Sequence, residues 1–381
     1  MRAIVTLFLA ALLPLFLSAQ SGDPSADKYT ALTTASQQVT HYSHDVQLAA
    51  AISDDEVTSP TSEAQQSKSP GQQKPKPSKP KPTSDLDRPP IEGSMVGYID
   101  DAIVGSQIRL RFDAGFDNNR PDRAEFFYAE CGCNGSPAAG PAPGLVLHLN
   151  FQQLYMRAEY ALTKRFSFFA EVPIRWVQPQ VFDSRTIPST GGFGSQAGLS
   201  DLQAGFKFAL LASREHYLTF QFLADFPSGD SSKGLGTAHY SIQPSLLYFQ
   251  KLTDRLSFEA QLAGTHAFQG DYPGFQGDVF TYGLGPSYTL YKGERLRVAP
   301  VIELVGWRVL GGLQTNAALL NLTPPVLPPI ESAEGTNIVN LKAGLRTSIG
   351  THNSFYVGFG QALTHEIWYK HVVRLEYRYT F

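Results

Sequence analysis

Two short motifs in this 381-residue sequence combine residue types that carry out chemistry. His239-Tyr240-Ser241 places a base two positions from a hydroxyl nucleophile, and Cys131-Gly132-Cys133 places two thiols at the same spacing. Acyl hydrolysis also needs a third group that orients the base, and no Asn is clearly placed for that role. A disulfide across one residue would be strained, and a metal would need further ligands nearby. We therefore expect no catalytic residue, no metal site and no cofactor, and we keep hydrolysis at Ser241 as the lesser alternative.

Ionic side chains form a larger candidate set, because they recur at alternate positions of several segments. Successive side chains of a strand point to opposite faces, so residues of one parity share a face. The sequence predicts that these residues line one enclosed polar face: Arg109, Arg111, Arg157, Glu159, Glu171, Arg175, Asp201, Lys207, Asp225, Glu259, Arg295, Arg297, Glu303, Lys342, Arg346, Arg374, Glu376 and Arg378.

Twelve strand-like segments would position these charges. Strands of soluble proteins are usually ~5–6 residues long, whereas a tilted strand needs ~9–11 residues to cross a membrane. The segments here are 11 to 15 residues long, enough for such a crossing, and they span residues 105–115, 148–160, 166–178, 198–211, 216–227, 237–250, 255–268, 279–291, 294–308, 336–349, 353–365 and 370–381.

Apolar residues occupy the opposite parity within these segments. Over 216–227, apolar side chains from Leu218 to Phe226 alternate with Thr219, Gln221 and Asp225. A barrel with a lipid face and a wet lumen has this two-residue repeat. A soluble sandwich has it too, because one face of each sheet is buried. Alternation alone therefore leaves both folds open.

The connections between the segments favour the barrel, because short links alternate with long ones. The short links are residues 161–165, 212–215, 251–254, 292–293 and 350–352, and the long ones are 116–147, 179–197, 228–236, 269–278 and 309–335. Only the final outer link, 366–369, breaks this size pattern. Outer-membrane barrels have short turns at one rim and long loops at the other. An even number of strands would place both ends of the barrel at the short-turn rim.

Three regions follow one another along the chain. Arg2 precedes an apolar run from Ala3 to Phe16 with small residues after it, so residues 1–19 are predicted to be a secretory signal peptide. Residues 20–92 are rich in Pro, Lys, Ser and Gln and include Lys-Pro repeats from Lys74 to Pro82. Such a segment cannot bury a core, so we expect it to be disordered. Residues 93–381 are predicted to form the barrel.

Composition excludes one class of partner and supports a β fold. Charged residues make up 17% of the chain and the formal net charge is −3, so nothing indicates nucleic-acid binding, which requires a dense basic surface. The 25 Phe, 17 Tyr, 33 Gly and 26 Pro residues favour strands and turns.

Three segments resemble a known family. They are Phe169-Ala170-Glu171-Val172-Pro173, the run from Gly198 to Lys207 with the sequence GLSDLQAGFK, and Phe226-Pro227-Ser228-Gly229-Asp230. They are similar to segments of the bacterial outer-membrane proteins described as putative transporters of the MetA pathway of phenol degradation. The resemblance covers about residues 95–381 and leaves out the Lys-Pro region and the two cysteines. It implies passage of small, aromatic or apolar molecules through the outer membrane, and it carries over no binding residue.

The terminal residue, Phe381, ends an alternating aromatic strand. Such a strand resembles the signal that the barrel-assembly machinery recognises in outer-membrane proteins. The sequence thus predicts an all-β, transmembrane antiparallel barrel of about twelve strands in the outer membrane of a Gram-negative bacterium. Its expected partners are membrane lipid, the assembly machinery and a small-molecule solute, with residues 20–92 in the periplasm. A porin-like channel is the first functional expectation. The alternatives are a closed structural barrel that binds through its long loops, and a membrane-embedded lipid hydrolase.

Overall fold

The computed structural model describes residues 93–119, 146–182, 195–268, 277–323 and 330–381. The predicted signal peptide, the predicted disordered segment, Cys131 and Cys133 lie outside these residues, as does part of each of the long links 116–147 and 309–335. Within the described residues, no helix has the length and apolar character needed to cross a membrane.

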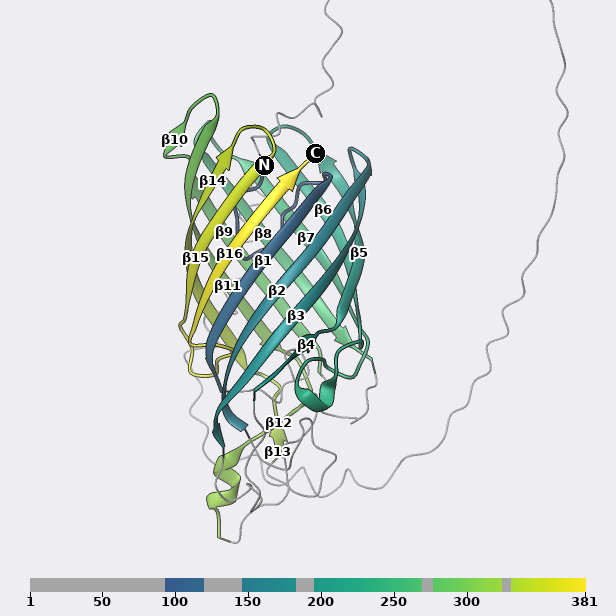
Figure 1. The fold of residues 1–381 in the computed structure, drawn as a ribbon, viewed down its shortest axis with the longest axis vertical. Coiled ribbons are helices and arrows are strands. Elements are labelled where there is room, and N and C mark those ends of the chain that lie inside the picture. The colour runs from purple at the N-terminus through teal and green to yellow at the C-terminus, as the bar shows by residue number, and fades with distance from the viewer. Residues whose placement is uncertain (1–92, 120–145, 183–194, 269–276, 324–329) are drawn as a thin grey trace, which may run out of the picture. The chain divides into compact units, whose positions relative to one another are not determined.

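The described strands form one antiparallel sheet that closes on itself, as predicted (Figure 1). Twelve long strands make the wall, and the described chain has four shorter strands beside them. Strand β16 pairs with β1, and β9 pairs with β11, so the wall has no free edge. The wall strands are β1 (Gln107–Asn118), β2 (Val146–Thr163), β3 (Phe166–Phe182), β5 (Leu202–Ala212), β6 (His216–Phe226), β7 (Ser241–Lys251), β8 (Leu256–Ala267), β9 (Val279–Tyr288), β11 (Leu296–Val309), β14 (Asn337–Ile349), β15 (Asn353–Ala362) and β16 (His371–Thr380).

In the described residues, the four short strands and two 3-10 helices belong to the connections. Strand β4 (Gln196–Leu199) pairs with β3, and β10 (Tyr291–Lys292) pairs with β11. The predicted strand 198–211 is therefore interrupted, because Ser200 and Asp201 separate β4 from β5. The remaining elements are β12 (Leu313–Thr315), β13 (Ile330–Ser332), η3 (Ser231–Lys233) and η4 (Ala317–Asn321).

The two rims differ as the link lengths predict. One end of the barrel carries the turns between β2 and β3, β5 and β6, β7 and β8, and β14 and β15, and we call it the short-turn rim. Strands β4, β12 and β13 lie at the opposite end, the long-loop rim (Figure 1). Strand β1 begins and β16 ends at the short-turn rim, where the Phe381 backbone N–H donates to the Ser106 carbonyl oxygen.

Side-chain alternation divides the wall into an apolar exterior and a polar interior. On β16, Val373 and Leu375 are exposed at 36% and 49%, whereas Arg374 and Glu376 are exposed at only 8% and 4%. The same alternation holds on β1, where Ile108 and Leu110 are exposed and Arg109 is buried. The apolar side chains of these strands therefore lie on the exposed outer face, and the ionic side chains lie on the buried inner face.

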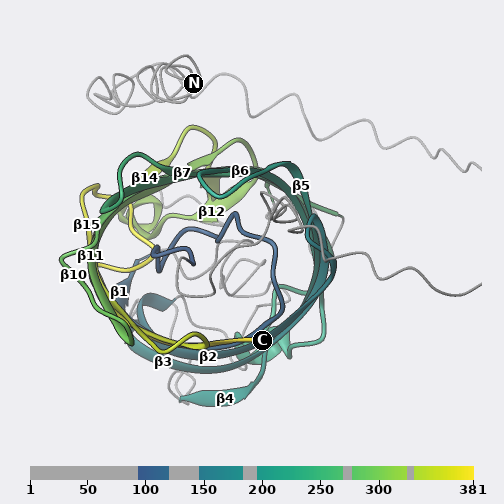
Figure 2. The same ribbon diagram turned by 90° about the horizontal axis from the view of Figure 1, so that it is seen from above.

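The segment that precedes β1 lies inside the ring of strands. Residues 93–106, which we call the luminal segment, form no strand or helix, and most of them are buried. The segment is the dark-blue trace within the barrel in the view along its axis (Figure 2). The sequence placed this stretch at the start of the barrel but did not predict that it fills the interior.

Candidate functional site

The predicted ionic residues occupy the interior, with one exception. Arg295 is exposed in the turn that precedes β11. Arg297 is partly buried near the short-turn rim, where its guanidinium donates to the Thr289 hydroxyl at 2.8 Å. Arg111 and Asp225 are partly buried. The others are buried on the inner face: Arg109, Arg157, Glu159, Glu171, Arg175, Asp201, Lys207, Glu259, Glu303, Lys342, Arg346, Arg374, Glu376 and Arg378.

Ion pairs join many of these charges across the interior, between adjacent strands or between strands two apart in the sheet. Glu171 accepts from Arg109 at 3.2 Å and from Arg111 at 3.3 Å. Asp113 accepts two hydrogen bonds from Arg374, each 2.6 Å long. Glu376 lies 2.9 Å from Arg346 and 3.1 Å from Arg378, and Glu159 lies 3.1 Å from Lys207. Charged groups buried in this way require partners, because an unpaired buried charge is costly.

The luminal segment satisfies its backbone through charged side chains of the wall. A segment outside a sheet or helix must find other partners for its N–H and carbonyl groups. The Glu303 carboxylate accepts from three consecutive N–H groups, those of Gly97, Tyr98 and Ile99, at 2.9–3.1 Å. The Glu259 carboxylate accepts from the Ser94 hydroxyl at 2.7 Å and the Met95 N–H at 3.0 Å.

Arginines bind the carbonyl oxygens of the same segment. Arg346 donates to the carbonyls of Met95 and Val96 at 2.9 and 2.6 Å, and Arg374 donates to the Gly97 carbonyl at 2.6 Å. Wall carboxylates thus hold the N–H groups, and wall guanidinium groups hold the carbonyls. Hydrogen bonds to charged groups are about twice as strong as neutral ones, so the wall charges fix this segment in place.

Two aspartates anchor the second half of the luminal segment. Asp101 lies 3.0 Å from Arg378, and Asp100 accepts from Gln221 at 2.9 Å. The chain then returns to the short-turn rim at Ser106. The segment therefore enters and leaves at the same rim, and its innermost residues lie around Tyr98.

The tip of the luminal segment packs closely against the wall. The Tyr98 ring lies 4.2 Å from Lys342 Nζ and 4.2 Å from Arg374 Cζ, measured to the ring centroid. Its ring also makes an edge contact with Tyr356 at 6.0 Å. Gly97 faces Tyr356 so closely that an added Cβ would stand 2.2 Å from the Tyr356 ring.

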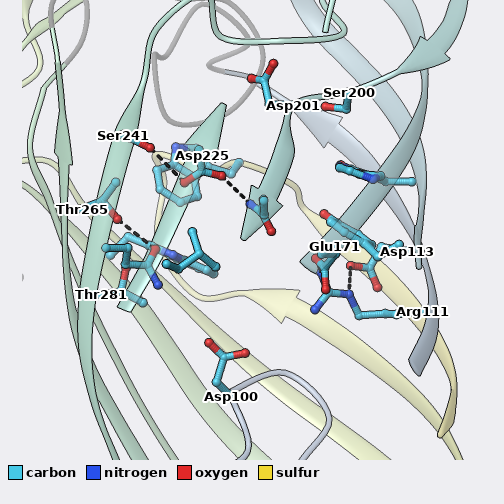
Figure 3. A pocket seen from close by; sticks show the side chains of 18 of the residues that line it. Asp100, Arg111, Asp113, Glu171, Ser200, Asp201, Asp225, Ser241, Thr265 and Thr281 are labelled. Carbon is cyan, nitrogen blue, oxygen red and sulfur yellow. Dashed lines mark hydrogen bonds and ion pairs between the residues drawn. The ribbon is translucent and has the colours of Figure 1, made fainter. Parts of the chain in front are cut away.

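A cavity of about 350 Å³ lies between this tip and the long-loop rim. Ligand pockets typically have volumes of ~300–1,000 Å³. Figure 3 shows polar residues from several strands and from the luminal segment around it: Asp225 accepts from Ser241, Thr265 and Thr281 lie on the same lining, and Asp100 comes from the luminal segment. An aromatic side completes the cavity, with Trp307, Trp368 and Tyr369.

The aromatic side includes residues of the connection between β15 and β16. Trp368 is 4% exposed, and its ring centroid lies 4.9 Å from that of Trp307, with the two rings tilted. Tyr369 lies beside it, 6.4 Å from Trp307. The chain between β15 and β16 folds inward here, so strand parity could not place these residues.

The His-x-Ser motif lies in the same lining. Ser241 Oγ donates to the Asp225 carboxylate at 2.9 Å, and His239 Nδ1 lies 2.9 Å from the Thr237 carbonyl oxygen. Both residues face the lumen, as strand parity predicts. In the described residues no cluster of His, Cys, Asp and Glu has the arrangement of a metal site.

Comparisons with known proteins give similarity at the level of the fold. No family model matches the sequence, and no curated protein matches it in sequence. The outer-membrane channel COG4313 from Pseudomonas putida F1 is 13% identical, with a TM-score of 0.46, and the match covers 76% of this chain and 100% of that chain. The NanC porin is 9% identical, with a TM-score of 0.37, covering 71% of this chain and 100% of that one. LpxR from Salmonella typhimurium is 10% identical, with a TM-score of 0.38, covering 72% and 100%.

Proposed function

We propose that this chain is an outer-membrane channel or transporter for small molecules, closed in its resting state by the luminal segment. The observation that carries the proposal is the inverted distribution of side chains: the exterior is apolar and the interior is ionic. Monomeric soluble proteins rarely expose large contiguous apolar surfaces, whereas the two-faced alternation here is that of a membrane barrel. Its exterior partner is then membrane lipid.

The interior supports a conduit with a removable obstruction. Side chains fill the interior of an eight-stranded barrel, and a sixteen-stranded barrel encloses an aqueous channel. A twelve-stranded barrel is intermediate in width. Here much of the space is occupied by residues 93–106 and not by wall side chains alone. The cavity beyond the tip is a partly open space of about 350 Å³, large enough for a small solute. Displacing the segment would join this cavity to the short-turn rim.

The orientation follows from the rims. Short turns of outer-membrane barrels face the periplasm, and residue 93 lies at the short-turn rim. Residues 20–92 would then lie in the periplasm, after export directed by residues 1–19. The aromatic C-terminal strand that ends at Phe381 supports insertion by the barrel-assembly machinery. Membership in the MetA-pathway transporter family, and with it a preference for aromatic or apolar solutes, remains part of this proposal.

One alternative has a specific observation in its favour. The ion pairs and the luminal segment close the interior, as a structural or surface-interaction barrel would require. A lipid hydrolase finds less support, because Ser241 faces the lumen and not the apolar exterior where lipid would lie.

Conductance in planar bilayers tests the channel. Glu303→Gln would place an amide NH₂ where a carboxylate oxygen now accepts an N–H, so the luminal segment would be held less firmly. Loss of about 2 kcal/mol in hydrogen bonds to a charged group would raise the open fraction about 30-fold. A chain with residues 94–104 replaced by Gly and Ser should conduct continuously.

Glu215→Gln provides the matched control, because the Glu215 side chain is 68% exposed at a short turn. This variant should behave as the wild type. If neither the Glu303 variant nor the replaced segment produces conductance steps, although both insert as folded barrels, the channel proposal is wrong and the closed structural barrel is favoured.

A further inference from the structure

One cation of the cavity has no ionic partner. Lys342 is 3% exposed and lines the cavity, and within the described residues its ammonium makes no ion pair and no hydrogen bond. The carboxylates of the same lining are all engaged: Asp113 binds Arg374, Glu171 binds Arg109 and Arg111, and Asp225 accepts from Gln203 and Ser241. Lys342 therefore presents its amino group to the cavity without an ion-pair contact to any described carboxylate.

The luminal segment explains why Lys342 is left without a carboxylate. Glu303 stands directly opposite Lys342 in the pairing of β11 with β14. Both side chains point inward, so a cross-strand ion pair would be the ordinary outcome. Instead, both Glu303 oxygens accept N–H groups of the luminal segment. The luminal segment thus occupies both oxygens of the carboxylate that would otherwise form the ion pair with Lys342.

Aromatic rings surround this ammonium group. Lys342 Nζ lies 4.2 Å from the Tyr98 centroid, 5.1 Å from Trp307 and 5.5 Å from Tyr369. Trp368 extends the surface from Trp307, and Phe151 lies 6.4 Å from Tyr369. Ring faces attract the cation, but they do not supply a negative charge. A flat apolar body can stack on these rings while an anionic group reaches the ammonium.

We propose that this cavity binds a small organic monoanion with an aromatic body, of the aromatic carboxylate class, with its carboxylate on Lys342. The proposal rests on the channel function above and names the substrate class of its cavity. The carboxylate forms a charge-assisted hydrogen bond with Nζ, and the ring lies against Trp307, Trp368 and Tyr369. A neutral analogue lacks the ionic contact, and a small aliphatic acid lacks the stacking surface.

Isothermal titration of the full chain in detergent micelles tests this class with benzoate as the probe. Benzamide has the same shape without the charge, and acetate has the charge without the ring. We expect benzoate to bind at least tenfold more tightly than either. Lys342→Met should weaken benzoate binding at least tenfold and leave benzamide binding unchanged. Lys342→Arg keeps the positive charge and should retain benzoate binding within about threefold.

The controls separate a loss of the site from a loss of the fold. Lys251→Met removes a lysine that pairs with the exposed Asp254 at 3.2 Å, and it should bind benzoate like the wild type. Heat-modifiable migration on gels confirms that each variant is a folded barrel. Equal affinity for benzoate and benzamide, or an unchanged affinity in Lys342→Met, would overturn the proposal.

The bilayer experiment distinguishes this inference from the channel proposal. If Glu303→Gln opens the barrel but no protein binds benzoate, the channel stands and the assignment of the ligand class is wrong. If benzoate binds through Lys342 but no variant conducts, the ligand site stands and the channel proposal fails.

Discussion

Glu303 is the residue on which the state of the interior depends. Its two oxygens accept three backbone N–H groups and the Tyr356 hydroxyl. Side-chain carboxylates that replace a strand partner in this way let a peptide stay buried without a sheet. The same arrangement leaves Lys342 on the facing strand without its natural counter-ion. One acid thereby helps to hold the luminal segment and leaves Lys342 without an ion-pair contact.

Gly97 gives a prediction at this scale. Gly97→Ala would bring a Cβ within 2.2 Å of the Tyr356 ring, and that ring is itself confined by Gly344 and Gly358. Overpacking of this kind typically costs ~1–3 kcal/mol, so the luminal segment should dissociate from the wall more often. Hydrogen exchange measured by mass spectrometry should be about 5–150-fold faster at the amides of residues 97–99.

Gly105 is the matched control, because a Cβ at that position would have no neighbour within 4 Å. Gly105→Ala should therefore leave exchange at residues 97–99 unchanged. Equal exchange in the two variants would show that close packing at Gly97 does not hold the segment.

At the scale of elements, the break between β4 and β5 forms a joint with the connection that follows β6. The Asp201 carboxylate accepts from the Gly229 N–H at 3.0 Å and from both the N–H and the hydroxyl of Thr237 at 2.7 and 2.9 Å. Ser228 bridges the same elements, because its hydroxyl donates to the Ser200 carbonyl oxygen. Two of the segments that resemble the transporter family, 198–207 and 226–230, thus meet in one structural feature.

Asp201→Ala should release this connection without opening the barrel. Three hydrogen bonds to a carboxylate are lost, and each such bond contributes ~1.5–3 kcal/mol. Allowing for replacement by water, the amides of Gly229 and Thr237 should exchange at least 30-fold faster, with β5 and β6 unchanged. Asp254→Ala is the control: it removes a 95% exposed acid and should leave exchange at Gly229 and Thr237 unchanged. Faster exchange throughout β5 and β6 would instead make Asp201 a determinant of the barrel wall.

The wall could be predicted from the sequence because its information is local. The segment 216–227 alternates apolar and polar residues except at Leu223, and β6 is observed at His216–Phe226. The luminal segment has no such repeat: Met95, Val96, Ile99 and Ile103 are apolar without period, beside Asp100 and Asp101. An apolar run too irregular for a strand, with two adjacent acids, was the available signal. The Lys342 environment depends on the register of β11 against β14 and on an inward-folded connection, and neither is local.

At the scale of the whole molecule, the exterior decides between membrane and water. Leu375 lies on the outer face of β16 and is 49% exposed among Phe112 of β1 and Val357 of β15, which pair with it. Leu375→Arg should cost ~2–4 kcal/mol if this face meets the hydrocarbon midplane, and a basic residue near an interface costs only ~0–1 kcal/mol. Denaturant unfolding of the barrel in phospholipid vesicles measures the difference.

Leu290→Arg supplies the comparison, because Leu290 is 63% exposed in the turn after β9 at the short-turn rim. The cost at Leu375 should exceed the cost at Leu290 by about 2 kcal/mol. Equal, near-zero costs at both positions would mean that water surrounds the barrel, and the membrane assignment would then be wrong.

The path of residues 93–106 has a mechanical consequence. The luminal segment enters and leaves the barrel at the short-turn rim. Its wall partners follow in chain order: Glu259 first, then Arg346, then Glu303 and Arg374. Tension applied at Gly93 would load these attachments one after another, so that they yield as in peeling and not all together as in shear. Withdrawal of the luminal segment would require no strand of the wall to separate. When the tension is released, the segment could return along the same contacts.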